Sequence, residues 1–113
     1  MAAPVDLVRL ERLTDGDPEF TRDLASTFRD SGQQQLLEIG KALEATDRVA
    51  LARAAHKLKG ASANIFAEAL TELAARLEAE APGAEIAHLR QVSDALLHEF
   101  NRTNEFLEGS QPL

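Results

Sequence analysis

The stretch Ala55-His56-Lys57-Leu58-Lys59-Gly60-Ala61-Ser62-Ala63-Asn64-Ile65 has the pattern of an amphipathic helix. At about 100° per residue, one side carries an apolar series spaced three and four residues apart: Leu51, Ala54, Leu58, Ala61 and Ile65. His56 falls on the opposite side, and its face is shared by Ala52, Lys59, Gly60 and Ala63. The pattern predicts a seam that faces a core and, on the other side, an exposed imidazole cleared of bulk by small neighbours.

Upstream of this stretch, residues 4–13 predict a short helix that lies across one end of the domain. Pro4 suits a first helical turn, and leucine recurs at every third position from Leu7 to Leu13. The polar residues 14–17 break this helix, and Asp17 is expected to cap the next one with Pro18 in its first position.

The arm Pro18–Ala45 carries one apolar stripe: Phe20, Leu24, Phe28, Leu36, Ile39 and Leu43. Ser31-Gly32 interrupts the arm, and Ser31 with Gln34 has the spacing of a capping box. One long helix with a bend and two helices placed end to end both fit this pattern. We favour the bend.

Three further helices follow, and together they define the fold class. Asp47 is expected to cap the His56 helix, which runs to about Ile65. Residues 67–79 predict a helix with buried leucines, and a long last helix starts at about residue 84. Residues 1–3 and 109–113 are expected to fray. Short connections and the absence of any strand pattern predict an all-α, antiparallel up-and-down four-helix bundle, with the short N-terminal helix across one end. Residues 1–113 then form a single domain.

Composition narrows the functional classes. The 113 residues contain no cysteine, which suits the reducing cytoplasm, and neither a signal peptide nor an apolar run of membrane-spanning length is visible. A formal net charge of −7 argues against nucleic acid and anionic membranes as partners. Arg53, Lys57 and Lys59 nevertheless form a local basic cluster around His56.

The segment 56–65, His-Lys-Leu-Lys-Gly-Ala-Ser-Ala-Asn-Ile, resembles the signature of the histidine-containing phosphotransfer (HPt) domain. That pattern consists of His, any residue, an apolar residue, Lys, Gly and then small residues. The resemblance extends from Asp17-Pro18-Glu19-Phe20 to the last helix. It implies that His56 is phosphorylated, that Lys59 lies near the phosphoryl group, and that Gly60 lets a partner approach.

Two further positions follow from the resemblance. The family often places a polar residue that holds the ring 22 residues after the histidine, and this position is Glu78. A carboxylate there would accept a hydrogen bond from one ring nitrogen and leave the other free to attack. Many members carry glycine where this chain has Phe66, which we expect either to pack the corner between two helices or to belong to the docking rim.

The implied function is that of a phosphorelay intermediate. His56 would accept a phosphoryl group from an aspartyl-phosphate receiver domain and pass it to another, with Lys59 offsetting the added negative charge. We see no nucleotide-binding loop and no metal-ligand pattern, since His88 and His98 lie ten residues apart. The chain is therefore expected to have no cofactor, no metal and no kinase activity of its own, and Mg²⁺ is expected in the partner receiver.

The expected partners are response-regulator receiver domains and a hybrid sensor histidine kinase, without nucleic acid or direct membrane contact. We expect a cytoplasmic monomer, either free or as the soluble tail of a membrane-anchored hybrid kinase. One alternative is a degenerate HPt-like module that docks partners but transfers nothing. Another is a sensor-kinase dimerisation region, which usually needs a second chain to complete its bundle; here Lys57 also replaces the acidic residue typical after that histidine.

Overall fold

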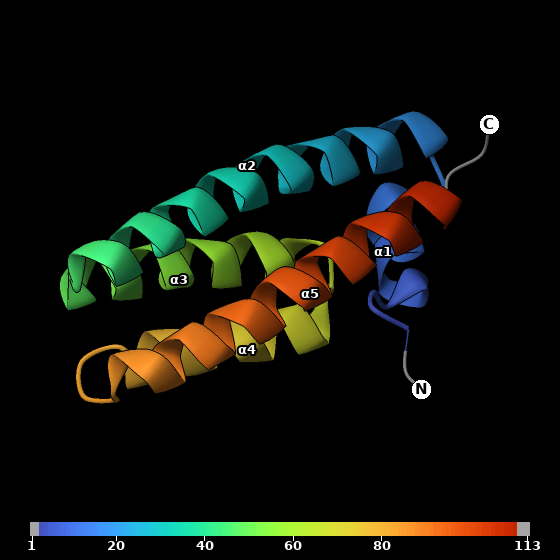
Figure 1. Cartoon of the computed structure of the whole chain (residues 1–113). Helices are drawn as coiled ribbons and strands as arrows, with labels where there is room; N and C mark the ends of the chain where they lie inside the picture. Colours follow the sequence, from blue (N-terminus) through green and yellow to red (C-terminus); the bar gives the residue numbers. More distant parts are fainter. Residues whose placement is uncertain (1–2, 111–113) are drawn as a thin grey trace.

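The computed structural model describes residues 3–110, which form five α-helices (Figure 1). Four of them, α2 (Pro18–Ala45), α3 (Arg48–Asn64), α4 (Glu68–Glu80) and α5 (Ile86–Ser110), run alternately up and down, and α5 packs back against α2. The short helix α1 (Leu7–Thr14) lies across the end of the bundle at which α2 begins. The predicted four-helix bundle with a helix across one end is confirmed.

Side-chain caps fix where α2 and α3 begin. The carboxylate of Asp17 accepts a hydrogen bond from the backbone N–H of Glu19 at 2.9 Å, and Pro18 occupies the first turn. Asp47 accepts from the N–H of Ala50 at 3.0 Å. Both residues satisfy N–H groups that have no partner within the helix, so both predicted starts are correct.

Helix α1 begins later than predicted. Asp6 has extended backbone angles, and its side chain accepts from the N–H of Arg9 at 3.2 Å, so Leu7 is the first helical residue and Pro4 lies outside the helix. A carboxylate that caps an exposed N–H defines a helix start more strongly than a proline in first position. The helix then continues to Thr14, and Asp15 adopts a left-handed conformation with φ 54°.

Helix α2 passes through Ser31-Gly32 without a break, so the predicted capping box does not form. Gln34 donates instead to the carboxylate of Glu38, one turn further along the same helix. A Cβ atom at position 32 would collide with the ring of Phe100 on α5. Gly32 therefore allows the two helices to approach closely and does not interrupt α2.

The core is formed by apolar residues from all five helices and the loops between them. On α3 the buried face is wider than the predicted seam, because α3 packs against both α2 and α4. Ala55 and Ser62 are fully buried, and Ala61 is only half-buried. Ser62 satisfies its hydroxyl by donating to the carbonyl of Leu58 at 2.7 Å. Phe20, expected in the apolar stripe of α2, is 42% exposed.

The other boundaries differ slightly from prediction. Helix α4 starts and ends one residue later than expected, and α5 starts at Ile86. Gly109 and Ser110, for which fraying was expected, belong to α5. Residues 1–2 and 111–113, for which fraying was also expected, lie outside the described residues.

Candidate functional site

His56 lies on the solvent side of α3, with 64% of its side chain exposed. Gly60 and Ala63 on the same face are exposed, and Ala52 is half-buried. A Cβ atom added at Gly60 would meet nothing within 4 Å, and α3 continues through this residue. Within the described chain, neither packing nor a helix kink requires glycine at this position. Its effect is that no side chain projects from the surface beside His56.

Glu78 on α4 binds both the ring of His56 and the ammonium group of Lys59. Its Oε2 lies 2.9 Å from Nδ1 of His56, and Nζ of Lys59 donates to its Oε1 at 2.7 Å. The sequence-predicted residues His56, Lys59 and Glu78 therefore form one hydrogen-bonded cluster, and Gly60 lies beside it without taking part.

The ionisation of Glu78 determines the role of each ring nitrogen. The hydrogen bond from Lys59, followed by that from His56, holds the pKa of Glu78 below its ordinary value of 4.5 against the opposing effect of desolvation. An ionised carboxylate accepts but cannot donate, so Nδ1 carries the hydrogen of this bond. Nε2 then keeps its lone pair, and within residues 3–110 no protein group bonds to it.

The corner between α3 and α4 sets the register that brings His56 and Glu78 together. At 1.5 Å per residue, His56 lies roughly 12 Å before the end of α3 and Glu78 roughly 15 Å after the start of α4. The corner is closed by two backbone hydrogen bonds, from Phe66 to Ala63 at 3.1 Å and from Ala67 to Ser62 at 3.0 Å. Because the two antiparallel helices are joined so tightly, His56 and Glu78 lie at similar distances from the corner along the bundle axis.

Phe66 adopts the left-handed conformation at this corner, with φ 61°. Glycine adopts such a conformation without strain, whereas a bulky residue does so at a cost. The surroundings hold Phe66 in place. The guanidinium of Arg9 lies 5.7 Å from the ring centroid, and the carbonyl of Phe66 accepts from the N–H of Asp6 at 3.0 Å. Phe66 therefore packs the corner and attaches α1 to it.

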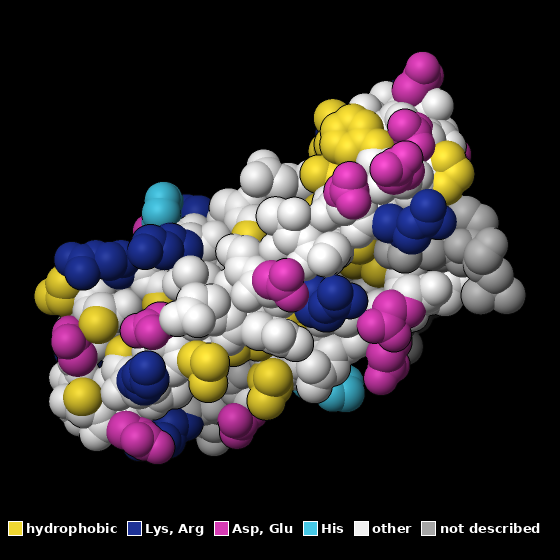
Figure 2. Space-filling view, turned by 90° about the horizontal axis from the view of Figure 1, so that it is seen from above, with side chains coloured by type: hydrophobic (Ala, Val, Ile, Leu, Met, Phe, Trp, Pro, Cys, Tyr) yellow, Lys and Arg dark blue, Asp and Glu magenta, His cyan; other side chains and the backbone are white. Residues whose placement is uncertain are grey.

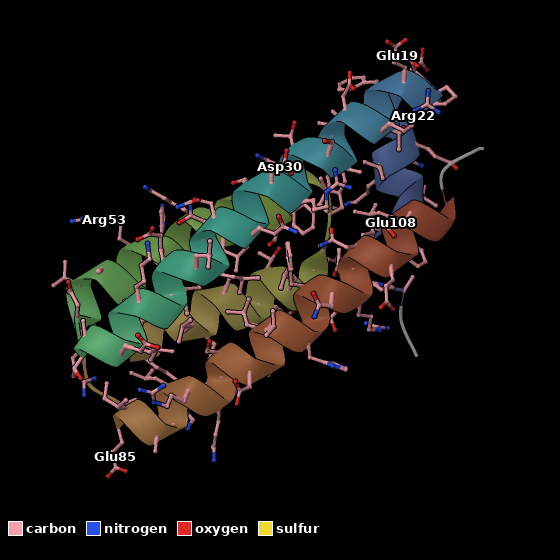
Figure 3. All side chains as sticks on the ribbon, turned by 45° about the horizontal axis from the view of Figure 1, so that its top comes forward. Glu19, Arg22, Asp30, Arg53, Glu85 and Glu108 are labelled. Carbon is pink, nitrogen blue, oxygen red and sulfur yellow. The ribbon has the colours of Figure 1, made fainter. Side chains whose placement is uncertain are left out.

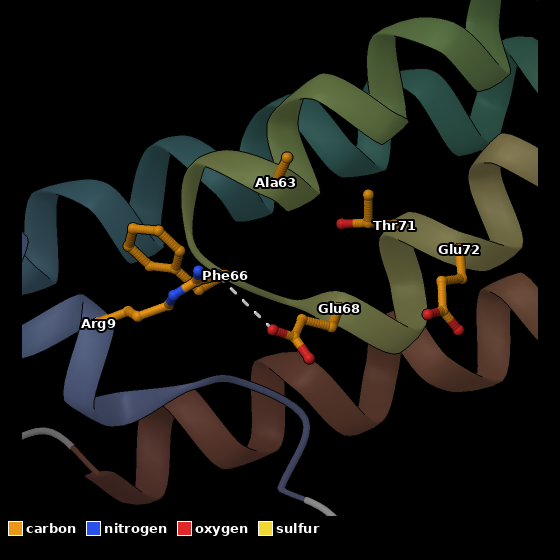
Figure 4. A pocket seen from close by; sticks show the side chains of 6 residues that line it. All are labelled: Arg9, Ala63, Phe66, Glu68, Thr71 and Glu72. Atoms are coloured by element: carbon orange, nitrogen blue, oxygen red, sulfur yellow. Dashed lines mark ion pairs between the residues drawn. The ribbon is translucent and has the colours of Figure 1, made fainter.

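A hollow of about 270 Å³ lies next to this corner, and Figure 4 shows its lining residues. Arg9 closes one side and pairs with Glu68 at 3.7 Å, and Ala63 lies two turns along α3 from His56. A larger groove of about 600 Å³ lies between α2 and α5. Neither hollow is lined by His56, which stands on an open surface suited to contact with another macromolecule.

A second cluster on α4, which the sequence analysis did not anticipate, joins Arg76, Glu80 and His88. The carboxylate of Glu80 accepts from Nε of Arg76 at 3.0 Å and from Nε2 of His88 on α5. The hydrogen bond from His88, followed by that from Arg76, lowers the pKa of Glu80. Acidic and basic residues four positions apart on one helix were the available signal for the Arg76–Glu80 pair.

Within residues 3–110, no group of three or more His, Asp or Glu side chains is arranged to hold a metal ion. None of the five described helices combines the length and the apolar character needed to cross a bilayer.

The fold is a closed bundle of four helices with a fifth across one end, and His56 with its carboxylate partner Glu78 lies on its surface. Families of phosphotransfer domains have this kind of fold. Comparison with known families supports this class, since the model described as the Hpt domain matches residues 23–103, more than two thirds of the chain. The chain belongs to the Hpt domain family and has a role in histidine phosphotransfer within a phosphorelay.

A solved structure similar to this chain is the crystal structure of histidine-containing phosphotransfer protein B (HptB) from Pseudomonas aeruginosa PAO1. The two share 26% sequence identity with a TM-score of 0.87, and the match covers 96% of this chain and 95% of the other. The similarity therefore includes α1 as well as the four-helix bundle. No curated protein matches the chain significantly in sequence.

Proposed function

We propose that His56 accepts a phosphoryl group from the aspartyl phosphate of one receiver domain and passes it to the aspartate of another. This proposal rests on the different surroundings of the two ring nitrogens of His56. Nδ1 is bound to Glu78 at 2.9 Å, and Nε2 faces solvent on a side chain that is 64% exposed. A phosphorylated receiver would therefore meet an oriented nucleophile that needs no rearrangement of this chain.

In the transfer step, the lone pair of Nε2 attacks phosphorus while the bond from phosphorus to the aspartyl oxygen breaks. The released carboxylate remains in the receiver, and the Nδ1 hydrogen stays on the ring, which becomes formally cationic. The Glu78 carboxylate stabilises this cation through the existing hydrogen bond. A protonated ring is also the better leaving group, so the same contact favours the onward transfer.

Lys59 and Gly60 support the step in different ways. Lys59 supplies a positive charge one turn from His56, which offsets the roughly two negative charges of the phosphoryl group. Its bond to Glu78 keeps its ammonium close to the ring before transfer. Gly60 leaves room for the receiver, because a side chain there would stand on the open surface beside the acceptor.

The rest of the active site is proposed to come from the partner. Phosphoryl transfer depends mainly on positioning and charge stabilisation, and the receiver's acidic residues and Mg²⁺ would supply what this chain does not. A hybrid sensor kinase is the proposed source of one such receiver. We propose that the domain acts as a monomer, since its helices already form a closed bundle, and in the cytoplasm, which suits a chain without cysteine.

The test is phosphoryl transfer from a panel of receiver domains labelled with radioactive acetyl phosphate. The unmodified domain should become labelled by at least one receiver, and His56→Gln should not. His88→Gln and His98→Gln are the matched controls and should label like the unmodified domain, since neither ring belongs to the site. Labelling of His56→Gln would disprove the assignment.

A second readout separates this function from a docking module that transfers nothing. If the unmodified domain binds a phosphorylated receiver in a pull-down but is never labelled by any of them, the docking alternative is correct. Gel filtration should give the size of a monomer, and a stable dimer would favour the sensor-kinase dimerisation region.

A further inference from the structure

Helix α3 is basic in an otherwise acidic protein. It contains four cationic residues and no acidic one, whereas the whole chain has a net charge of −7. Two of the four cations serve the fold or the site. Arg48 donates to the carbonyls of Ala81 and Ala84 at 2.9 and 2.6 Å, and Lys59 binds Glu78. The other two cations, Arg53 and Lys57, have no such contact within the described residues.

Arg53 and Lys57 are exposed, and neither forms an ion pair or a hydrogen bond with any residue between 3 and 110. They lie four residues apart on one helix, where like charges repel each other. The nearby carboxylate of Glu38 on α2 accepts from Gln34 and pairs with Lys41 at 3.8 Å. No specific contact within the described residues uses these two charges, and their mutual repulsion carries a small cost.

Their position relative to His56 is specific. At about 100° per residue, Arg53 and Lys57 lie on the side of His56 that faces α2, and Lys59 with Glu78 lies on the other side. They border a shallow groove of about 330 Å³ between α2 and α3, whose lining also includes Gln34, Gln35, Glu38, Ala50 and Ala54. The acceptor histidine thus stands between a basic edge and its own carboxylate.

The figures show this edge in the context of the whole surface. In Figure 3 the side chain of Arg53 points away from the bundle. In Figure 2, Lys and Arg side chains lie side by side next to a histidine, at the end of the molecule where α2 ends. Acidic side chains gather at the opposite end, where Glu19 is labelled in Figure 3. Acidic side chains also lie at the end where α2 ends, so the basic edge is a local patch on a surface of mixed charge.

We infer that Arg53 and Lys57 form a docking site for the carboxylate-rich surface that surrounds the phosphorylated aspartate of a receiver domain. This inference rests on the function proposed above. A protein that holds Mg²⁺ and a phosphoryl group on an aspartate needs further carboxylates around them, and so presents a negative surface. A partner with a charge of −7 would be repelled from that surface unless it offered a local positive edge. These two residues act on encounter and orientation, and they take no part in the chemistry.

The decisive variant is the double charge reversal Arg53→Glu/Lys57→Glu. Its matched control is Arg22→Glu/Arg90→Glu, which changes the net charge equally at two exposed residues that form no ion pair in the described structure. Both are assayed with the receiver that labels the unmodified domain fastest. At low salt, the double reversal at positions 53 and 57 should lower kcat/KM for transfer roughly tenfold or more, and the control should change it less than about threefold. The loss should shrink in high salt, because the Debye length falls to about 3 Å at 1 M.

Direct phosphorylation of His56 by phosphoramidate, a small donor that needs no docking surface, separates docking from chemistry. At high salt the double reversal at positions 53 and 57 should be labelled by phosphoramidate like the unmodified domain. If transfer from the receiver is also unchanged at low salt, the docking inference is wrong, although the phosphotransfer function stands. If both donors fail on a folded variant, the two residues belong to the chemistry and the inference is equally wrong. Failure of the unmodified domain with every receiver would instead contradict the proposed function.

Discussion

Two clusters, each formed by one glutamate, one histidine and one cationic side chain, lie on opposite sides of α4, and only the cluster of His56 is proposed to be reactive. Glu78 and Glu80 are two residues apart and therefore project about 200° from each other. Glu78 faces α3 and binds His56 and Lys59; Glu80 faces α5 and binds His88 and Arg76. Each carboxylate thus holds one imidazole and one cation, and each has a lowered pKa.

The clusters differ in which ring nitrogen is bound. His56 is held through Nδ1, so the outward Nε2 is free, and 64% of its side chain is exposed. His88 is bound to Glu80 through Nε2, and 39% of its side chain is exposed. The ring nitrogen of His88 that Glu80 leaves unbound is therefore Nδ1, the nitrogen nearer its own backbone. A carboxylate near a histidine therefore does not by itself identify a phosphoryl acceptor, and the nitrogen that it binds must be known.

Replacing each glutamate in turn should give the largest difference in transfer rate between the two clusters. Glu78→Ala should slow single-turnover transfer from a labelled receiver by roughly 10- to 100-fold, because the ring loses the partner that orients it. Glu80→Ala should leave the rate within about twofold. Glu78→Gln should restore part of the rate, because an amide oxygen still accepts from Nδ1–H. Equal rates for Glu78→Ala and the unmodified domain would show that the ring needs no orientation.

A smaller effect is expected from replacing each cation. Lys59→Ala should leave folding intact and slow transfer roughly three- to tenfold, or shorten the lifetime of the phosphohistidine, because one partly solvated charge near the phosphoryl group is lost. Arg76→Ala should change neither quantity. Both are measured from the decay of label on the purified domain and from single-turnover rates. A Lys59→Ala variant that matched Arg76→Ala would retire the role proposed for Lys59.

Most of the architecture could be predicted from the sequence because its signals are local. Asp17 and Asp47 are each followed by a helix with a regular apolar period, and caps and periodicity depend only on nearby residues. The start of α1 was missed because Asp6 and Pro4 offer competing signals, and only the observed hydrogen bond to Arg9 decides between them.

Glycine shows where local signals fail. Gly32 and Gly60 both lie inside helices, and the sequence analysis interpreted the first as an interruption and the second as a clearance. In the structure, Gly32 allows α2 to approach Phe100, which lies 68 residues further along the chain, whereas Gly60 faces open space. Which neighbour a missing side chain accommodates depends on tertiary packing, and no spacing within the helix reveals it.

The residues of the candidate site could be predicted from the sequence, but their geometry could not. The resemblance indicated His56, Lys59 and Glu78, but not that the two oxygens of Glu78 divide between the ring and the ammonium group. The glycine that many family members carry at position 66 was a signal for the left-handed conformation of Phe66. The contacts with Asp6 and Arg9 that hold it there belong to a distant segment and had no local signal.

The smallest expected effect concerns the dependence of stability on pH, which should be shared by the two clusters. The folded-state pKa values of Glu78 and Glu80 are lowered from the ordinary value of 4.5, so ionisation of both groups favours the folded state. This stabilisation is present above about pH 4.5 and is lost as the pH falls through the lowered values. In urea unfolding, the midpoints of Glu78→Gln and Glu80→Gln should therefore lie below that of the unmodified domain at pH 6, and the differences should shrink towards pH 3.

The two variants should resemble each other in this measurement and differ in transfer, where only Glu78→Gln loses rate. A midpoint difference for Glu80→Gln that stayed constant from pH 6 to pH 3 would show that its hydrogen bonds stabilise the fold without linkage to ionisation. A loss of transfer in Glu80→Gln would break the comparison itself. In that case a change at Glu80 would affect Glu78 through α4, the helix that carries both residues. The His88 cluster would then influence the chemistry at His56.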